Sequence, residues 1–100
     1  MERKLERFRD PKIKELFQSV LGELEKRGVE TKPIHGTWIS FWYRGKRFMN
    51  MAPRQKFFVA NVLTLGNQWA GLQRIATRKE WDDLFQTQIT KYLEFLDASE

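Results

Sequence analysis

Residues 38–51 read WISFWYRGKRFMNM, and this stretch decides the fold. Aromatic and β-branched side chains fill its first half, as is typical of β-strands. Arg44-Gly45 fits a two-residue turn in which the glycine supplies a positive φ. The sequence therefore predicts a β-hairpin whose turn is crowded by basic residues, namely Arg44, Lys46 and Arg47.

The register of this hairpin decides which side chains face the core, because a slip of one residue exchanges the two faces. Counted from the turn, Trp42 lies opposite Arg47 and Ser40 lies opposite Met49. The face predicted for the core carries Ile39, Phe41, Tyr43, Phe48 and Ala52. The opposite face carries Trp38, Ser40, Trp42, Arg47, Met49 and Met51. This second face is apolar enough to need a cover, either a second protein chain or the N-terminal side chains of Leu5 and Phe8.

Two amphipathic helices are predicted on either side of the hairpin. The first begins at Asp10-Pro11, where Asp caps free N–H groups and Pro is tolerated at the first helical position. It ends near Gly28, which suits a left-handed cap. The second begins at Thr77, whose spacing from Glu80 matches a capping box. Apolar residues follow each start at intervals of three and four, which indicates one buried stripe per helix.

Four strands are predicted between the helices, over residues 37–43, 47–52, 57–65 and about 71–76. The order α-β-β-β-β-α is that of an α+β fold built on a four-stranded antiparallel meander with helices at both chain ends. The sequence shows no internal repeat, low-complexity segment or linker, so residues 1–100 are expected to form a single domain. Residues 1–10 are expected to be either flexible or folded back onto it.

Composition narrows the class of protein. The chain contains no cysteine, which excludes disulfides, thiolate metal sites and a cysteine nucleophile. Its hydrophobic fraction of 41% is that of a globular protein rather than a disordered one. The start, MERKLERFRD, lacks the apolar segment of a secretory signal, and the sequence has no apolar run approaching the roughly 18 residues of a spanning helix. We therefore expect a soluble, cytoplasmic protein that does not associate with membranes.

The net charge of +5 is distributed unevenly along the chain. Residues 31–79 contain nine Lys and Arg residues and no Asp or Glu. Residues 1–30 are nearly neutral, and residues 80–100 are acidic. The predicted sheet is therefore a positive region between two helical ends, which favours a polyanionic partner.

Three segments resemble a known family. They are IKELFQSVLGELEKRG (13–28), WISFWYRGKRFMNMAPRQK (38–56) and TRKEWDDLFQTQITKYLEFL (77–96). They are similar to a small bacterial and archaeal domain of unknown function, which resembles the C-terminal module of proteins labelled "predicted transport protein" and also occurs beside restriction-type nuclease domains. The family pattern includes an R-G-R/K turn before a Phe and a P-x-K/R-K turn. These correspond here to Arg44-Gly45-Lys46-Arg47-Phe48 and Pro53-Arg54-Gln55-Lys56.

The chain departs from this family in one respect, because the connection after Leu65 is short where the family is expected to have a longer insert. The family has no established catalytic residues, so the resemblance implies none for this chain. Its nuclease neighbourhood implies an association with nucleic acid, and the fold by itself implies no particular function.

The residues of a catalytic or metal site are missing from the pattern. Metal-dependent nucleases hold two or more carboxylates together on a sheet to bind Mg²⁺, and the predicted sheet has none. Asp82 and Asp83 are adjacent on a predicted helix, so they point about 100° apart. His35 lies in a connection without an acidic neighbour, which is typical of a loop histidine rather than a general base. We therefore expect no enzymatic activity, no metal and no cofactor.

The strongest functional signal is a basic, aromatic surface on the predicted sheet. One end of the hairpin carries the basic turn, and the other end, about 17 Å away at 3.3 Å per residue, carries a second basic turn. Trp38 and Trp42 lie between them and are able to stack on bases or to hold Arg by a cation–π contact. The candidate nucleic-acid-binding residues are Arg44, Lys46, Arg47, Arg54, Lys56 and Trp42, with nucleic acid or another polyanion as the partner.

Two other interpretations stay open at this point. The apolar side chains of the second hairpin face would form a protein–protein or homodimer interface, with Trp38, Trp42, Met49 and Met51 as its candidate residues. Basic turns are also ordinary features that keep sheets soluble and protect their edges. The sequence alone does not separate these alternatives.

Overall fold

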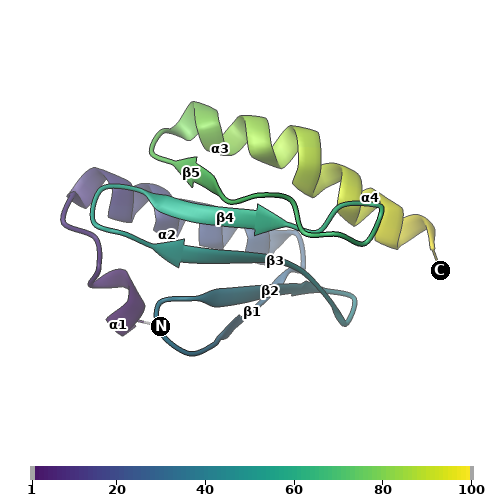
Figure 1. The fold of residues 1–100 in the computed structure, drawn as a ribbon, viewed down its shortest axis with the longest axis horizontal. Coiled ribbons are helices and arrows are strands. Elements are labelled where there is room, and N and C mark those ends of the chain that lie inside the picture. The colour runs from purple at the N-terminus through teal and green to yellow at the C-terminus, as the bar shows by residue number, and fades with distance from the viewer. Residues whose placement is uncertain (1, 100) are drawn as a thin grey trace.

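In the computed structural model, helices lie at both ends of the chain and an antiparallel sheet lies between them (Figure 1). The structure describes residues 2–99, so the two ends of the expected domain, Met1 and Glu100, lie outside the described residues. Among the residues described, no helix combines the length and the apolar character that crossing a lipid bilayer requires.

The N-terminal helices form where the sequence indicates. A short helix, α1 (Glu2–Leu5), precedes the longer α2 (Pro11–Lys26). Asp10 caps α2, because its carboxylate accepts a hydrogen bond from the Lys12 N–H at 2.9 Å. The chain leaves α2 through Gly28 at a φ of 88°, a conformation that glycine adopts at low cost. The predicted start and end of this helix are therefore confirmed.

The C-terminal helix is continuous but not uniform. It consists of α3 (Arg78–Leu84), a π-helical turn η1 (Phe85–Ile89) and α4 (Thr90–Ala98). The Thr77 hydroxyl accepts from the Glu80 N–H at 3.2 Å, so the predicted cap is confirmed. The return bond of the predicted capping box is displaced by one residue, because the Glu80 carboxylate accepts from the Ala76 N–H at 2.9 Å. Within η1 the Thr87 hydroxyl donates to the Asp83 carbonyl at 2.6 Å, a local contact that competes with the regular α pattern.

The sheet has five strands rather than the four predicted. They are β1 (Glu30–Pro33), β2 (Ile39–Tyr43), β3 (Lys46–Pro53), β4 (Phe58–Val62) and β5 (Gln73–Ile75). Each strand pairs antiparallel with its neighbour in sequence, in the order β1-β2-β3-β4-β5. The α+β class, the meander and the terminal helices are therefore confirmed. The strand that was not predicted, β1, lies at the edge of the sheet and is mostly exposed, so its sequence lacks the alternation of apolar and polar residues by which a strand is recognised.

A β-bulge in the central hairpin changes the predicted register. The turn is as expected, with Arg44 at φ 51° and Gly45 at φ 77°, and Trp42 pairs with Arg47. The register then shifts between Phe41 and Trp42, so that Phe41 pairs with Met49 instead of Phe48. Phe48 is the additional residue of the bulge. Every position of β3 beyond it therefore lies on the face opposite to the one predicted.

The faces of the hairpin are corrected accordingly. Ile39, Phe41 and Phe48 are buried in the core as predicted, whereas Tyr43 is only partly buried against it. Met49 and Met51 were predicted for the other face, but both are fully buried in the core, with 0% of their surface exposed. Ala52, which was predicted for the core face, alternates with Met51 and so lies on the opposite face of the sheet, where it is nonetheless fully buried.

All the larger helices pack on one face of the sheet. The ring of Phe17 in α2 contacts that of Phe58 in β4 at 4.9 Å between centroids. Phe58 in turn contacts Trp81 of α3 at 6.3 Å, and Phe48 of β3 stacks on Tyr92 of α4 at 6.1 Å. In Figure 1, α2 lies behind the strands. These aromatic contacts place the hydrophobic core between the sheet and the helices.

The N-terminal segment folds back, but not onto the tryptophans of the hairpin. Leu5 and Phe8 are buried members of the main core, and the ring of Phe8 lies 5.3 Å from that of Phe17. The Arg9 N–H also donates to the Gln55 carbonyl at 2.8 Å, which ties the segment to the turn between β3 and β4. Of the two alternatives expected for residues 1–10, the described part shows the fold-back, and its apolar side chains complete the core.

An ion pair joins the two halves of the helical layer. The Glu23 carboxylate of α2 lies 2.6 Å from the guanidinium of Arg78, at the start of α3. The hydrogen bond from Arg78 holds the pKa of Glu23 below its usual range. Because this pKa is lowered in the folded chain, the pair stabilises the fold above the ordinary glutamate pKa and stops doing so as the pH falls through the lowered value.

We therefore expect wild type and Glu23→Gln to differ in stability at neutral pH and to converge in acid. Chemical denaturation at about pH 7 and about pH 3 measures this difference. The difference in free energy of unfolding should shrink at the lower pH, since the contribution of the ion pair is lost as Glu23 becomes protonated. An equal difference at both pH values would contradict the ion pair. The effect is small because both partners are substantially exposed.

Candidate nucleic-acid interface

The sheet face turned away from the helices is polar along its centre. Ser40, Asn50 and Asn61 pair across β2, β3 and β4, and each alternates with core residues along its strand. We call these residues the polar row and the whole face the open face, since within residues 2–99 the larger helices pack on the other side. Asn50 donates from Nδ2 to the Asn61 Oδ1 at 3.2 Å. Its own Oδ1 is buried and, within the described chain, has no hydrogen-bond partner.

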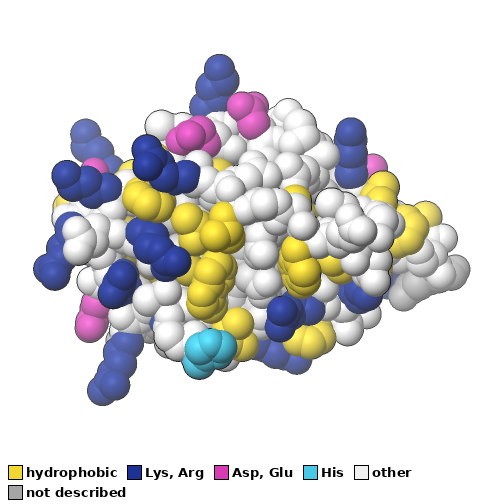
Figure 2. All heavy atoms as spheres, in the orientation of Figure 1, with side chains coloured by type: hydrophobic (Ala, Val, Ile, Leu, Met, Phe, Trp, Pro, Cys, Tyr) yellow, Lys and Arg dark blue, Asp and Glu magenta, His cyan; other side chains and the backbone are white. Residues whose placement is uncertain are grey.

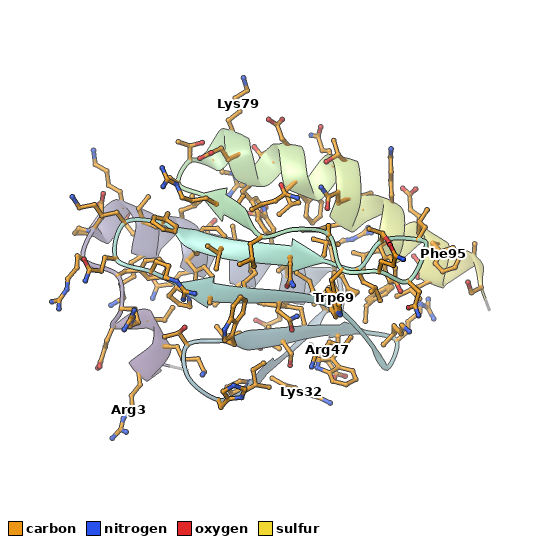
Figure 3. All side chains as sticks on the ribbon, in the orientation of Figure 1. Arg3, Lys32, Arg47, Trp69, Lys79 and Phe95 are labelled. Atoms are coloured by element: carbon orange, nitrogen blue, oxygen red, sulfur yellow. The ribbon has the colours of Figure 1, made fainter. Side chains whose placement is uncertain are left out.

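A row of alternating cations and aromatic rings lies on one side of the polar row. We call it the Trp42 row: Trp42 and Arg47 pair across β2 and β3, Trp69 lies beside Arg47, and Lys32 reaches Trp42 from β1, where Lys32 pairs with Ser40 and Glu30 pairs with Trp42. The Lys32 Nζ lies 4.3 Å from the centroid of the Trp42 ring. Arg47 is paired with Trp42 across the hairpin, and its guanidinium carbon lies 5.5 Å from the centroid of the Trp69 ring. Lys32, Arg47 and Trp69 are labelled in Figure 3.

A second alternating row lies on the other side of the polar row. We call it the Trp38 row, and it contains Trp38, Arg54, Phe57 and Arg74. The guanidinium carbon of Arg54 lies 5.7 Å from the Trp38 centroid, and that of Arg74 lies 4.8 Å from the Phe57 centroid. Arg54 is also held by hydrogen bonds to the Thr37 hydroxyl and the Pro53 carbonyl. Trp38 immediately precedes β2, and Trp42 lies four residues further along the extended chain, which separates the rows by about 13 Å.

Basic and hydrophobic side chains are interspersed over this face, and acidic side chains appear only toward its margins (Figure 2). Glu30 of β1 is the only Asp or Glu among the residues of the five strands. Because cations held over ring faces are stabilised by the ring quadrupoles, the rows carry four Lys and Arg residues beside a single strand carboxylate, that of Glu30 opposite Trp42. The open face is therefore both cationic and aromatic.

The structure separates the six predicted nucleic-acid-binding residues into two groups. Trp42, Arg47 and Arg54 lie on the open face, as described above. Lys46 pairs with Tyr43, whose ring packs against the core, so Lys46 lies toward the helix side of the turn. Lys56 is exposed in the turn between β3 and β4.

Arg44 is used to anchor the C-terminal helix instead. Its Nε lies 2.7 Å from the Asp97 carboxylate of α4, which also accepts a hydrogen bond from the Tyr43 hydroxyl at 2.7 Å. The hydrogen bond from Tyr43, followed by that from Arg44, holds the pKa of Asp97 below its usual range. Arg44 is therefore turned toward α4 rather than toward a ligand on the open face.

The predicted interface of Trp38, Trp42, Met49 and Met51 does not exist as one surface. The two tryptophans are half-buried on the open face, whereas the two methionines are fully buried on the other side. The bulge at Phe48 is the physical reason, because it reverses the facing of β3 relative to the count from the turn.

Four members of the rows were not predicted: Lys32, Phe57, Trp69 and Arg74. Arg74 precedes the buried Ile75, so strand alternation alone would have placed it outward. Phe57 precedes the buried Phe58 in the same way. Lys32 depends on recognising β1, and Trp69 lies in the irregular β4–β5 connection, where the sequence carries no periodic signal.

A second feature lies at the α4 end of the sheet. A pocket of about 300 Å³ is lined by Leu63, Thr64, Leu65, Ala70, Thr87, Gln88, Lys91 and Tyr92. Leu65 of its lining is 58% exposed, and three more large hydrophobic side chains are exposed on the segments that line it, with Trp69 at 41%, Leu72 at 60% and Phe95 at 46%. The first three belong to the β4–β5 connection and the last to α4. Exposed apolar groups gathered in this way are typical of an interaction surface.

The residues considered for catalysis are dispersed. His35 is exposed in the β1–β2 connection, where the Lys4 ammonium donates hydrogen bonds to the neighbouring Ile34 and Gly36 carbonyls. Asp82 pairs with Arg78 at 3.2 Å. In the part of the chain that the structure describes, no group of three or more His, Cys, Asp or Glu residues is placed to hold a metal ion.

Comparison with known proteins does not assign the chain to a family. No family model, no curated protein and no solved structure matches the chain. The resemblance drawn from the sequence therefore stays a prediction.

Proposed function

We propose that this chain is a non-catalytic module that binds nucleic acid through its open face. The observation that carries the proposal is the pair of alternating rows, in which each aromatic ring has a Lys or Arg held over it. Aromatic rings stack on bases, and basic side chains neutralise the phosphates between them. A surface on which rings and cations alternate along a line matches the alternation of bases and phosphates along a nucleic-acid strand.

The distribution of charge supports the same ligand. The acid-free stretch over residues 31–79 supplies all four cations of the two rows. Binding then releases counterions from the nucleic acid, which makes the affinity depend on salt concentration. A surface that only keeps the protein soluble has no need to place its cations over rings on one face.

We expect the affinity for a single-stranded oligonucleotide to fall with salt, with a log–log slope of roughly −2 to −3.5. This slope corresponds to about three to five phosphate contacts at about −0.7 each. Fluorescence titration at several salt concentrations measures it, and retention on a heparin column gives an independent test. Free passage through heparin at low salt, together with no binding of DNA or RNA, would refute the proposal.

A second candidate function, a protein interaction or homodimer module, is favoured by the exposed apolar side chains near the 300 Å³ pocket. If Leu72 contributes to such an interface, the wild type should sediment as a dimer and Leu72→Lys as a monomer. Since Leu72 is 60% exposed, the substitution should leave the melting temperature of the monomer nearly unchanged. A wild-type monomer at high concentration would exclude the homodimer.

A further inference from the structure

We infer that the ligand of the open face is single-stranded, and that its bases take the places now held by Lys and Arg over the four rings. This inference rests on the proposed function and narrows it to a class of ligand. It follows from three properties of the face: its width, the cations that lie over its rings, and the Asn50 Oδ1 at its centre, which has no hydrogen-bond donor among the described residues.

The open face is too wide to read a duplex. Five strands spaced by about 4.8 Å span roughly 19 Å, whereas the major groove of B-DNA is about 12 Å wide and admits a helix or a two-stranded ribbon. The rings also lie within the face rather than at a protruding tip. In a duplex the faces of the bases are covered by their neighbours, so these rings find stacking partners only on an unpaired strand.

The cations over the rings mark positions that a base can occupy. The Lys32 ammonium lies 4.3 Å above Trp42, and the Arg74 guanidinium lies 4.8 Å above Phe57. A planar guanidinium can lie over a ring face much as a base does, so a ring that accepts one can accept the other. Exposed cation–π contacts are weak, whereas a charge-assisted hydrogen bond to phosphate is strong. An arriving strand therefore draws each cation to a phosphate and leaves the ring free for a base.

The polar row offers what only an unpaired base can use. Asn50 is just 8% exposed, and within the described residues its Oδ1 has no hydrogen-bond donor. A buried acceptor without a donor is costly and calls for an explanation. The hydrogen-bonding edges of bases are free in a single strand and occupied by pairing in a duplex. A base stacked on either flanking row would present such an edge toward Asn61, the more exposed amide of the polar row, and would reach the buried Asn50 Oδ1 only once the side chains around it shift.

The test compares one oligonucleotide of about 12 nucleotides, within the usual range of site sizes, with its own duplex. Trp38, Trp42 and Trp69 lie on the open face, whereas Trp81 is buried in the core, so tryptophan fluorescence reports on this face directly. We expect the single strand to quench the emission and to bind at least about 10-fold more tightly than the duplex, as loss of one stacked base would give.

Two variants, one from each row, locate the stacking. Trp42→Leu and Phe57→Leu should each weaken single-strand binding roughly 5- to 150-fold, and neither should change the salt slope, because the phosphate contacts remain. Phe95→Leu, an equivalent change at an exposed ring of α4, should have no effect. Circular dichroism melts confirm that each variant is folded. Quenching of the wild type gives a readout that does not depend on the variants.

The outcomes separate this inference from the proposed function. No binding of either form would refute the proposed function itself. Equal or tighter binding of the duplex, or single-strand binding that neither ring variant weakens, would overturn the inference and leave nucleic-acid binding in place. Tighter binding of the single strand with loss in both ring variants supports it.

Discussion

Replacing Phe17 with alanine is expected to lower the free energy of unfolding by about 3–5 kcal/mol. Phe17 is fully buried at the centre of the core, and its ring contacts both Phe8 of the N-terminal segment and Phe58 of β4. Truncation removes these contacts and leaves a cavity among elements that pack from three directions. For a domain of this size the loss is a large part of a total of about 5–15 kcal/mol.

Thermal and urea denaturation of Phe17→Ala measure this loss. At about 4 °C or more per kcal/mol, the melting temperature should fall by at least about 12 °C. Phe95→Ala is the matched control, because Phe95 is 46% exposed and should cost much less. Leu21 and Phe85, which are only half-buried, should give intermediate losses. Equal melting temperatures for the Phe17 and Phe95 variants would mean that the core has been misplaced.

Reversing one charge in each row should reduce nucleic-acid affinity the most. Arg47→Glu combined with Arg74→Glu is expected to weaken single-strand binding about 100-fold or more at low salt. Each of the two lost charged hydrogen bonds is worth about 1.5–3 kcal/mol, and 1.4 kcal/mol corresponds to about tenfold. Both side chains are exposed and neither forms part of the core, so the fold should be retained.

A second double variant controls for net charge. Lys12→Glu combined with Lys79→Glu makes the same change in charge at exposed positions on α2 and α3, and Lys79 extends away from the sheet in Figure 3. Because contacts beyond a Debye length of about 10 Å are largely screened, this variant should lose little affinity at moderate salt. Similar losses in both double variants would show that binding follows net charge and not the open face.

The helices could be predicted from the sequence because their signals are local. Asp10-Pro11, Gly28 and the Thr77 cap each act within one helical turn, and all of them function as expected. The turn at Arg44-Gly45 is local in the same sense. Residues that specify their own backbone conformation can be interpreted without knowledge of the rest of the chain.

The register of β3 and the first strand could not be predicted, because neither is decided locally. Counting outward from a turn assumes regular pairing, and the bulge at Phe48 breaks it. Met49 and Met51 are buried because they complete the core beneath the helices, which is a tertiary preference. β1 exists because the edge of β2 accepts it, not because residues 30–33 favour a strand.

The candidate site was predicted only in outline for the same reason. The acid-free middle of the chain correctly indicated a basic sheet. Which basic residues belong to the site, however, depends on the face to which each side chain points and on the residues beside it. Arg44 pairs with Asp97, whereas Lys32 and Arg74 lie on the open face, on strands at opposite edges of the sheet. The distribution of charge can be read from the sequence, but the residues that lie beside one another across a sheet can be identified only when the strand register is known.

The strand order has a kinetic consequence. Because every strand pairs with the one before it in sequence, the sheet can grow one hairpin at a time, and each step closes only a short loop. Contacts between distant residues are needed only when the helices dock, as in the pairing of Glu23 with Arg78 and of Arg44 with Asp97. Low contact order speeds folding, so we expect this chain to fold faster than sheet proteins of its size in which distant strands pair. The unpaired edge of an unfinished meander is then exposed only briefly, which limits the time available for aggregation.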